Sequence, residues 1–288
     1  MPRFEPLNPH VGAEVLGVDL TRPLDEPTFE AIRNAFHRYS VLLIRGQPLD
    51  DGLQIAFARR FGRLERTRLG ALGEGSELVI LSNLDADGAT VPPDSKQLFD
   101  ARANQLWHSD ASFRPVPAYA SILSARRIPT AGGETEFAST RVALATLDAG
   151  TRARVQDLEA IHHFAHSRGQ IERGRLAKAE SDHLPPVRHP LVRLHSVTGE
   201  PALFVGSHVR EVIGLSPHEG RALVDSLISH ATRDELVYTH RWRADDLIMW
   251  DNSAVLHRGR PWDSRQARYM VRATVADDGY TAGALVAA

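Results

Sequence analysis

Two short histidine-containing segments carry the residue types that bind a metal ion. In Trp107-His108-Ser109-Asp110, an extended backbone would project the imidazole of His108 and the carboxylate of Asp110 from the same face. The second segment, DLIMWDNSAVLHRGRPWD, places His257 after a β-rich run. Two histidines and one carboxylate form a facial triad that leaves adjacent positions of iron(II) open for oxygen and a co-substrate. The chemistry that this set suggests is oxygen activation at a non-haem iron.

Neither segment is decisive by itself. The chain has 14 histidines, so a His-x-Asp tripeptide is expected about once by chance. A histidine hydrogen-bonded to a nearby aspartate is an ordinary structural arrangement, and His257 alone is equally compatible with a loop histidine. His162 and His166 form a rival pair, but no carboxylate motif accompanies them. A zinc hydrolase that uses His108 and His257, or a binding protein without turnover, also stays open at this point.

Two arginines near the C-terminus could bind anions. Arg268 and Arg272 are four residues apart, so a strand would present both guanidinium groups on one face. A guanidinium matches a carboxylate as a planar fork, and two buried arginines without partners would be compensated by bound anions. If the strand faces water, both are ordinary solvated arginines. The segment TAGGETEF adds a turn at Gly132 and Gly133 before Thr135, a residue that either donates its hydroxyl to an anion or simply favours a strand.

The elements that must position these residues are mostly strands. Runs rich in β-formers, punctuated by Gly, Pro, Asp and Asn, lie at 41–46, 78–83, 119–128, 202–206, 236–242, 246–252 and 268–275. Because no regular helix separates successive runs, the pattern predicts a β-sandwich or jelly roll with helices outside it. Apolar spacing predicts helices after Asp25 and after Asp50 or Asp51, and a capping box predicts a third that begins at Ser216.

Composition limits the classes of partner. Lys and Arg number 34 against 36 Asp and Glu, without long blocks of one sign, which argues against nucleic acid and favours a small ligand. Cysteine is absent, so any metal must be held by nitrogen and oxygen. No secretory signal or membrane-spanning run is present, so we expect a cytoplasmic protein without membrane contact.

We expect a single catalytic domain over residues 1–288. The polar stretch at 167–183 has few apolar residues, and it predicts a surface loop or a lid over the active site.

Considered together, the motifs resemble the TauD/TfdA family of 2-oxoglutarate-dependent dioxygenases, whose namesakes act on taurine and on 2,4-dichlorophenoxyacetate. The resemblance covers nearly the whole chain and rests on NQLWHSDASF, IPTAGGETEF, HPLVRLHSVTGEPALFVG and MWDNSAVLHRGRPWD followed by RYMVRAT. It implies a mostly β fold, the double-stranded β-helix or jelly roll, with flanking helices. It also implies Fe(II), 2-oxoglutarate and O2 as cofactors and co-substrates, and a homo-oligomer, because the family often forms dimers or tetramers.

The resemblance assigns roles to five of the residues discussed above. It makes His108, Asp110 and His257 the iron ligands, and it makes Thr135 and Arg268 the pair that holds the distal carboxylate of 2-oxoglutarate.

Further matches concern the substrate. Arg272 matches the family residue that meets the anionic group of the substrate, and Asn104 matches a position near it. Taurine-type members carry a histidine soon after the segment that matches Phe61-Gly62, where this chain has RLERTR. The motifs RGQPL, QIAFARRFG, NQLWHSD and WDNSAVLHRGR look closer to the phenoxyacetate-degrading branch. This implies hydroxylation of an aryloxyacetate, which breaks down to a phenol and glyoxylate, with succinate and CO2 as co-products. The alternative is oxidation of taurine, another alkylsulfonate or a sulfate ester.

Overall fold

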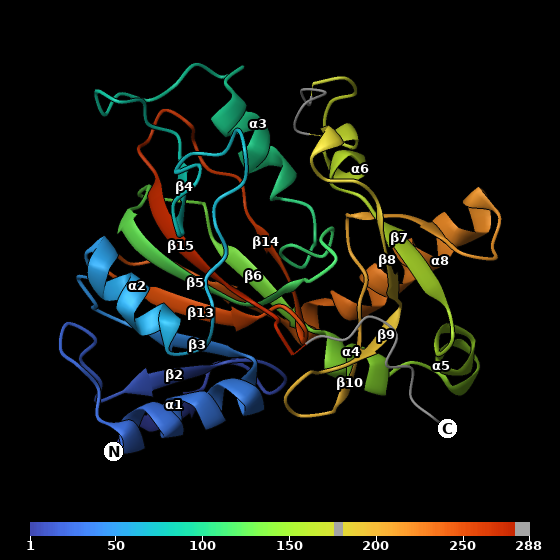
Figure 1. Cartoon of the computed structure of the whole chain (residues 1–288), viewed down its shortest axis with the longest axis horizontal. Coiled ribbons are helices and arrows are strands. Elements are labelled where there is room, and N and C mark those ends of the chain that lie inside the picture. Colours follow the sequence, from blue (N-terminus) through green and yellow to red (C-terminus); the bar gives the residue numbers. More distant parts are fainter. Residues whose placement is uncertain (176–180, 280–288) are drawn as a thin grey trace.

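The structure is a computed structural model that describes residues 1–175 and 181–279 (Figure 1). Its largest sheet has seven strands in the order β1-β2-β3-β13-β5-β15-β4. These strands are β1 (Arg3–Pro6), β2 (Ala13–Leu16), β3 (Val41–Ile44), β13 (Leu247–Asp251), β5 (Ala118–Arg127), β15 (Tyr269–Ala276) and β4 (Leu78–Ser82). Neighbouring strands pair antiparallel except β2 and β3, which are parallel.

A smaller sheet packs against one face of the large one. Its order is β12-β6-β14, with β12 at Val237–His240, β6 at Thr135–Ser139 and β14 at Val255–Gly259. Phe137 of β6 and Val255 of β14 share a buried cluster with Ile248, Trp250 and Met270 of the large sheet. Two antiparallel layers around one apolar core give the expected jelly-roll arrangement.

Two helices cover the opposite face of the large sheet. They are α1 (Glu26–Tyr39) and α2 (Asp51–Arg59). Ile32 of α1 and Phe57 of α2 belong to a second buried cluster with Leu42 of β3 and Met249 of β13. Alternate residues of β3 and β13 therefore enter different cores, which explains why VLLI and LIMWD are apolar throughout instead of alternating.

The remaining elements lie outside the two sheets of the jelly roll, most of them on the right in Figure 1. They comprise the sheet β11 (Val209–Val212), β7 (Glu159–His162) and β8 (Val187–Pro190), the pair β9 (Val192–Leu194) and β10 (Pro201–Leu203), the helices α3 (Lys96–Ala103), α4 (Thr140–Ala145), α5 (Ala149–Val155), α6 (Phe164–Gly169) and α8 (Pro217–Ala231), and the 3-10 turn Asp234–Leu236. Leu223 and Leu227 of α8 pack with Val212 of β11 and Leu203 of β10. Figure 1 shows α3 above β4 and α8 on the far side of β7. No helix in 1–175 and 181–279 has both the length and the apolar character needed to cross a membrane.

The three predicted helices and the seven predicted β-runs are confirmed, and the predicted helix starts carry capping residues. Asp25 accepts a hydrogen bond from the backbone N–H of Thr28, and Asp50 accepts one from Leu53, each at 2.7 Å. These bonds satisfy free amides at the starts of α1 and α2. Ser216 begins α8 with the predicted capping box. The predicted β-runs correspond to β3, β4, β5, β10, β12, β13 and β15.

The surface loop or lid predicted at 167–183 is wrong at its start. Ser167 and Arg168 lie in α6 and are buried, because they pack inward beside Phe164, over whose ring the Arg168 guanidinium lies at 4.4 Å. Residues 176–180 of this stretch lie outside the described residues. The remainder of the lid, and the single domain over 1–288, stay predictions.

Candidate active site

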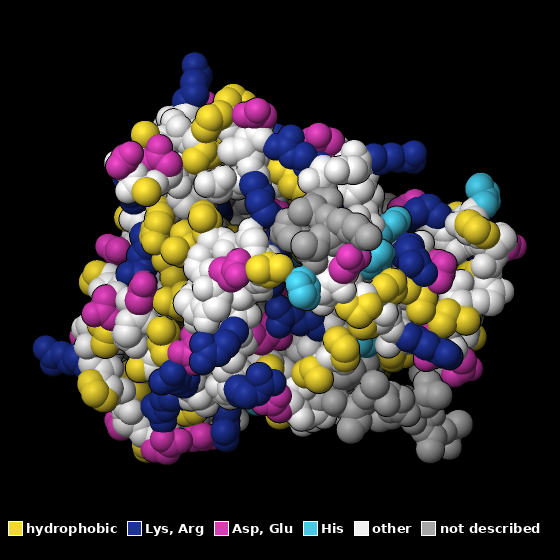
Figure 2. All heavy atoms as spheres, turned by 45° about the horizontal axis from the view of Figure 1, so that its top comes forward, with side chains coloured by type: hydrophobic (Ala, Val, Ile, Leu, Met, Phe, Trp, Pro, Cys, Tyr) yellow, Lys and Arg dark blue, Asp and Glu magenta, His cyan; other side chains and the backbone are white. Residues whose placement is uncertain are grey.

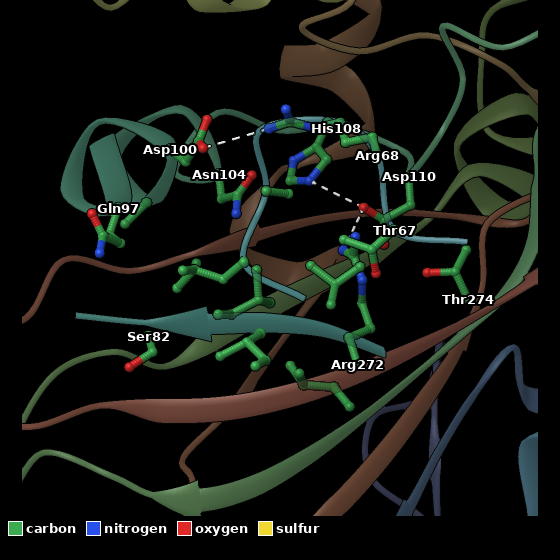
Figure 3. Close-up of a pocket in the computed structure, with 18 of the residues that line it drawn as sticks. Thr67, Arg68, Ser82, Gln97, Asp100, Asn104, His108, Asp110, Arg272 and Thr274 are labelled. Atoms are coloured by element: carbon green, nitrogen blue, oxygen red, sulfur yellow. Dashed lines mark hydrogen bonds and ion pairs between the residues drawn. The ribbon is translucent and has the colours of Figure 1, made fainter. Parts of the chain in front are cut away.

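A cavity of about 480 Å³ lies between β4, β15, α3 and the segments that carry the predicted metal ligands (Figure 3). Its lining includes every site residue predicted from the sequence, namely Asn104, His108, Asp110, Thr135, His257, Arg268 and Arg272. The structure therefore brings together residues that are up to 168 positions apart in the chain (272 − 104).

The three predicted metal ligands converge on one point. One ligand atom from each of His108, Asp110 and His257 lies within 4.8 Å of the other two, and all three residues are buried. Nε2 of His108 lies 3.8 Å from Oδ1 of Asp110, and Nε2 of His257 lies 3.6 Å from Oδ2. Within the described ranges no other histidine and carboxylate side chains form such a group of three or more. The rival pair His162 and His166 belongs to no such group.

A short antiparallel bridge sets the spacing of the two histidines. His108 and His257 exchange backbone hydrogen bonds of 3.0 and 2.9 Å, and their ring centroids are 4.2 Å apart. His257 lies on β14 as an extended residue, as expected. The expectation of a regular strand from His108 to Asp110 is wrong, since the bridge ends at His108, Asp110 begins a turn and Ala111 has a φ of 55°.

Asn252 holds Asp110 in place of the missing strand. Its side-chain oxygen accepts a hydrogen bond of 3.1 Å from the backbone N–H of Asp110, and its carbonyl accepts one of 2.6 Å from the hydroxyl of Ser109. The indole of Trp250 donates to the same side-chain oxygen at 3.0 Å. The amide nitrogen of Asn252 donates to Ser121, whose hydroxyl donates to Oδ2 of Asp110 at 2.7 Å. This network orients the carboxylate towards the histidines.

The carboxylate of Asp110 is kept ionised. Burial by itself would raise its pKa, but Arg272, whose Nη1 lies 2.7 Å from Oδ1, holds the pKa well below the ordinary value together with His257, His108 and Ser121. An ionised carboxylate whose two oxygens each lie near one of the two imidazoles can serve as a metal ligand together with them.

The two imidazoles are in the form that binds a metal. Burial lowers the pKa of both His108 and His257, so both rings are neutral. Nδ1 of His108 lies 2.7 Å from the carbonyl of Leu106, which places the proton on Nδ1 and leaves the Nε2 lone pair facing Asp110. The donor set of two imidazole nitrogens and one carboxylate fits Fe(II) with open positions.

Arg268 is a partly buried cation without an anionic partner among the described residues. Burial lowers the pKa of its guanidinium to about 10, a shift to which no carboxylate contributes. Its guanidinium lies 5.1 Å from the centre of the Trp262 ring, and Thr135 lines the same cavity. A buried guanidinium of this kind is costly unless a ligand supplies the anion. This part of the cavity therefore fits a carboxylate such as the distal one of 2-oxoglutarate.

Several cavity residues were not predicted from the sequence. Val79 and Leu81 of β4 and Leu98 of α3 give one side of the cavity an apolar wall. Arg68, Phe164 and Arg168 also line the cavity, and the guanidinium groups of Arg68 and Arg168 lie 4.6 and 4.4 Å from the centre of the Phe164 ring. The signal for Val79 and Leu81 was present, because they are alternate residues of a predicted strand. For Arg68, Phe164 and Arg168, by contrast, no periodic pattern in the sequence indicates a place in the cavity.

Known proteins are similar to this chain in sequence and in fold. Residues 3–274 match the family described as taurine catabolism dioxygenase TauD, TfdA family. The chain belongs to this dioxygenase family. The dioxygenase is 41% identical over 278 residues to the alpha-ketoglutarate-dependent 2,4-dichlorophenoxyacetate dioxygenase of Cupriavidus pinatubonensis (strain JMP 134 / LMG 1197), with 95% of this chain and 97% of that protein covered. It is 35% identical to the (S)-phenoxypropionate/alpha-ketoglutarate-dioxygenase of Delftia acidovorans, with 98% of this chain and 97% of that protein covered.

A solved structure is also similar to this chain over nearly its whole length. The crystal structure of AAD-2 in complex with Mn(II) and N-oxalylglycine matches this dioxygenase with a TM-score of 0.89 at 39% identity, covering 96% of this chain and 97% of that chain. The predicted jelly roll is confirmed. The protein is an Fe(II)- and 2-oxoglutarate-dependent dioxygenase, an oxidoreductase that acts on a small molecule.

Proposed function

We propose that this dioxygenase hydroxylates an aryloxyacetate beside its ether oxygen, so that the product breaks down to a phenol and glyoxylate while 2-oxoglutarate becomes succinate and CO2. The observation that carries the proposal is the cavity, which combines a cationic side chain at the metal end with an apolar wall. The phenoxyacetate and phenoxypropionate dioxygenases named above, which align over nearly their whole lengths, support the same substrate class.

In this proposal His108, Asp110 and His257 bind the iron. Fe(II) with 2-oxoglutarate supplies the oxygen activation that hydroxylates a C–H bond. The protein contributes neutral imidazoles, an ionised carboxylate and fixed ligand directions. Thr135 and Arg268 bind the distal carboxylate of 2-oxoglutarate, because Arg268 lacks an anion in the described chain and a guanidinium and a hydroxyl can both donate to it.

The substrate is placed by charge at one end and by apolar contact along its ring. Arg272 lies on the metal side of the cavity and binds the substrate carboxylate. Val79, Leu81 and Leu98 contact the aryl ring, and Asn104 faces the cavity from the end of α3 (Figure 3). The carbon between the carboxylate and the ether oxygen then lies nearest the metal, so position selects the carbon that reacts.

Product analysis tests this function. The protein is incubated with Fe(II), ascorbate, 2-oxoglutarate and either a phenoxyacetate or taurine, and phenol and sulfite are measured. We expect phenol and glyoxylate in equal amounts to succinate. Sulfite from taurine without phenol from any phenoxyacetate would assign the enzyme to the alkylsulfonate alternative, and turnover without oxygen would support a hydrolase.

We also propose that the enzyme is a cytoplasmic homo-oligomer, a dimer or tetramer, without nucleic-acid or membrane partners. In Figure 2, Lys and Arg side chains lie among Asp and Glu side chains on the face in view, in line with the overall balance of 34 basic and 36 acidic residues. Light scattering coupled to size-exclusion chromatography measures the oligomeric state, and a monomer would contradict this part of the proposal.

A further inference from the structure

The side chain of Thr135 has one hydrogen bond among the described residues, and it comes from a tryptophan. Nε1 of Trp242 lies 3.0 Å from Oγ1 of Thr135. Trp242 follows β12, whose residue His240 pairs with Thr135 across the sheet, and the Trp242 ring packs edge-on against the His240 ring at 4.5 Å. The indole is therefore held in place by its contact with His240 of β12 and does not rotate freely.

The direction of this hydrogen bond decides what the Thr135 hydroxyl can do. An indole N–H is only a donor, whereas a hydroxyl has one hydrogen and two lone pairs. Trp242 therefore occupies a lone pair of Oγ1 and leaves the hydroxyl hydrogen to be donated elsewhere. No acceptor for this hydrogen exists among the described residues, and Thr135 is buried and lines the cavity. A ligand in the cavity can therefore accept this hydrogen.

The guanidinium of Arg268, which lies in the same region, also needs an acceptor. Arg268 is a donor only and has no anionic partner in the described chain. Gly133, two residues before Thr135, has a φ of 72°, and a Cβ there would lie 3.4 Å from Nε of Arg268. The glycine turn thus brings Arg268 beside the start of β6. Two donors with unused hydrogens in one buried region match the two oxygens of a carboxylate.

We propose that Trp242 is a positioning residue for 2-oxoglutarate, which fixes the Thr135 hydroxyl as a donor to the distal carboxylate. This inference rests on the proposed roles of Thr135 and Arg268. Trp242 does not line the cavity, so it acts only through Thr135. Without the indole N–H, the hydroxyl can rotate to other partners, including water, and is no longer committed to the carboxylate.

The experiment measures equilibrium binding, without turnover, to the full-length protein loaded with Mn(II). Calorimetry gives the dissociation constants for 2-oxoglutarate and for 2-oxobutyrate, a 2-oxo acid that lacks the second carboxylate. We expect Trp242→Phe, which keeps an aromatic ring but removes the N–H, to weaken the binding of 2-oxoglutarate about 5-fold, the effect of one hydrogen bond. The binding of 2-oxobutyrate should stay unchanged. Trp107→Phe, the same substitution at a tryptophan outside the cavity lining, should leave the ratio of the two dissociation constants unchanged.

A double-mutant cycle makes the test specific to Thr135. In a Thr135→Val background, Trp242→Phe should change the dissociation constant for 2-oxoglutarate less than about 2-fold, because the hydroxyl is already absent. Equal, additive effects in both backgrounds, or equal effects on both ligands, would overturn the inference and assign Trp242 a general structural role. If Thr135→Val and Arg268→Ala themselves leave 2-oxoglutarate binding unchanged, the proposed carboxylate site fails instead.

Discussion

Nη1 of Arg272 lies 2.7 Å from Oδ1 of Asp110, so the residue proposed to bind the substrate also contacts a proposed iron ligand (Figure 3). Nε of Arg272 is buried without a hydrogen-bond partner among the described residues. The guanidinium therefore has donors left over for a substrate carboxylate. A substrate carboxylate bound by Arg272 would therefore lie close to Asp110, the proposed iron ligand that the same guanidinium contacts.

Arg268→Ala should weaken the binding of 2-oxoglutarate selectively. Loss of a buried guanidinium that binds a carboxylate costs about 2 kcal/mol or more, so the Michaelis constant for the co-substrate should rise at least about 30-fold, with less than about a 3-fold change in that for the aryloxyacetate. Steady-state kinetics with each substrate varied in turn measure both constants. Arg265→Ala is the matched control, since Arg265 lies in the same loop but is exposed and pairs with Asp263. Equal effects on both Michaelis constants would contradict the assigned role.

Arg272→Ala should remove the preference for an acidic substrate. We expect the ratio of kcat/KM for a phenoxyacetate to that for its neutral methyl ester to fall about 30-fold or more, because the charge-assisted bond is lost only for the acid. A ratio that stays unchanged would show that the substrate carboxylate binds elsewhere.

Asn252→Ala should weaken metal binding although Asn252 is not itself a ligand. The substitution removes the acceptor for the backbone N–H of Asp110 and the donor to Ser121, and both contacts orient the carboxylate. Loss of such supporting contacts typically lowers metal affinity about 10–100-fold, so we expect this effect on the dissociation constant for Mn(II). Asn8→Ala is the control, because Asn8 bonds only to a backbone carbonyl and to its own loop. Unchanged Mn(II) binding would contradict the importance of the network.

The sequence predicts the chemistry of the site better than its local geometry. His108, Asp110 and His257 are identified by residue type and order, and the structure brings them together. The strand expected from His108 to Asp110 is absent, because the side chain of Asn252 accepts the hydrogen bond of the Asp110 backbone N–H. The alternation of residues along the segment cannot reveal a contact with a residue so distant in sequence. Tertiary contacts of this kind override local pattern.

Elements with a strong local signal are predicted and elements that depend on long-range contacts are not. The α1, α2 and α8 helices have capping residues and an apolar stripe, and the predicted strands have continuous β-formers. The helices α3 to α6 are too short to show a helical apolar periodicity. In addition, α6 has no side-chain cap. Arg168 was expected on the surface because of its charge, yet the Phe164 ring and Asp100 hold it inside.

Gly133→Ala should cost both stability and affinity for 2-oxoglutarate. Its φ of 72° is unfavourable for alanine, and the new Cβ would lie 3.3 Å from Pro129 and 3.4 Å from Nε of Arg268. We expect a loss of about 1–2 kcal/mol in the free energy of unfolding and a several-fold weaker binding of 2-oxoglutarate. Gly88→Ala separates the two effects, because Gly88 has a φ of 81° and nothing within 4 Å of a new Cβ. It should lose stability alone, and an equal effect of both variants on 2-oxoglutarate binding would contradict the close approach to Arg268.

His189 should contribute to the loss of stability in acid. Burial lowers its pKa from 6.5 to about 4, so the folded protein keeps this imidazole neutral while the unfolded chain binds a proton below about pH 6.5. The unfolded state therefore binds more protons between about pH 6.5 and 4, and stability falls as the pH falls through this window. His189→Gln keeps an N–H donor for the carbonyl of Arg114, which His189 contacts at 3.0 Å, but cannot be protonated. In urea unfolding measured across this pH range, the variant should lose less stability than the unmodified protein, by up to about 1.4 kcal/mol per pH unit, the contribution of one proton. Identical slopes for His189→Gln and the unmodified protein would mean that the imidazole is already charged in the folded state.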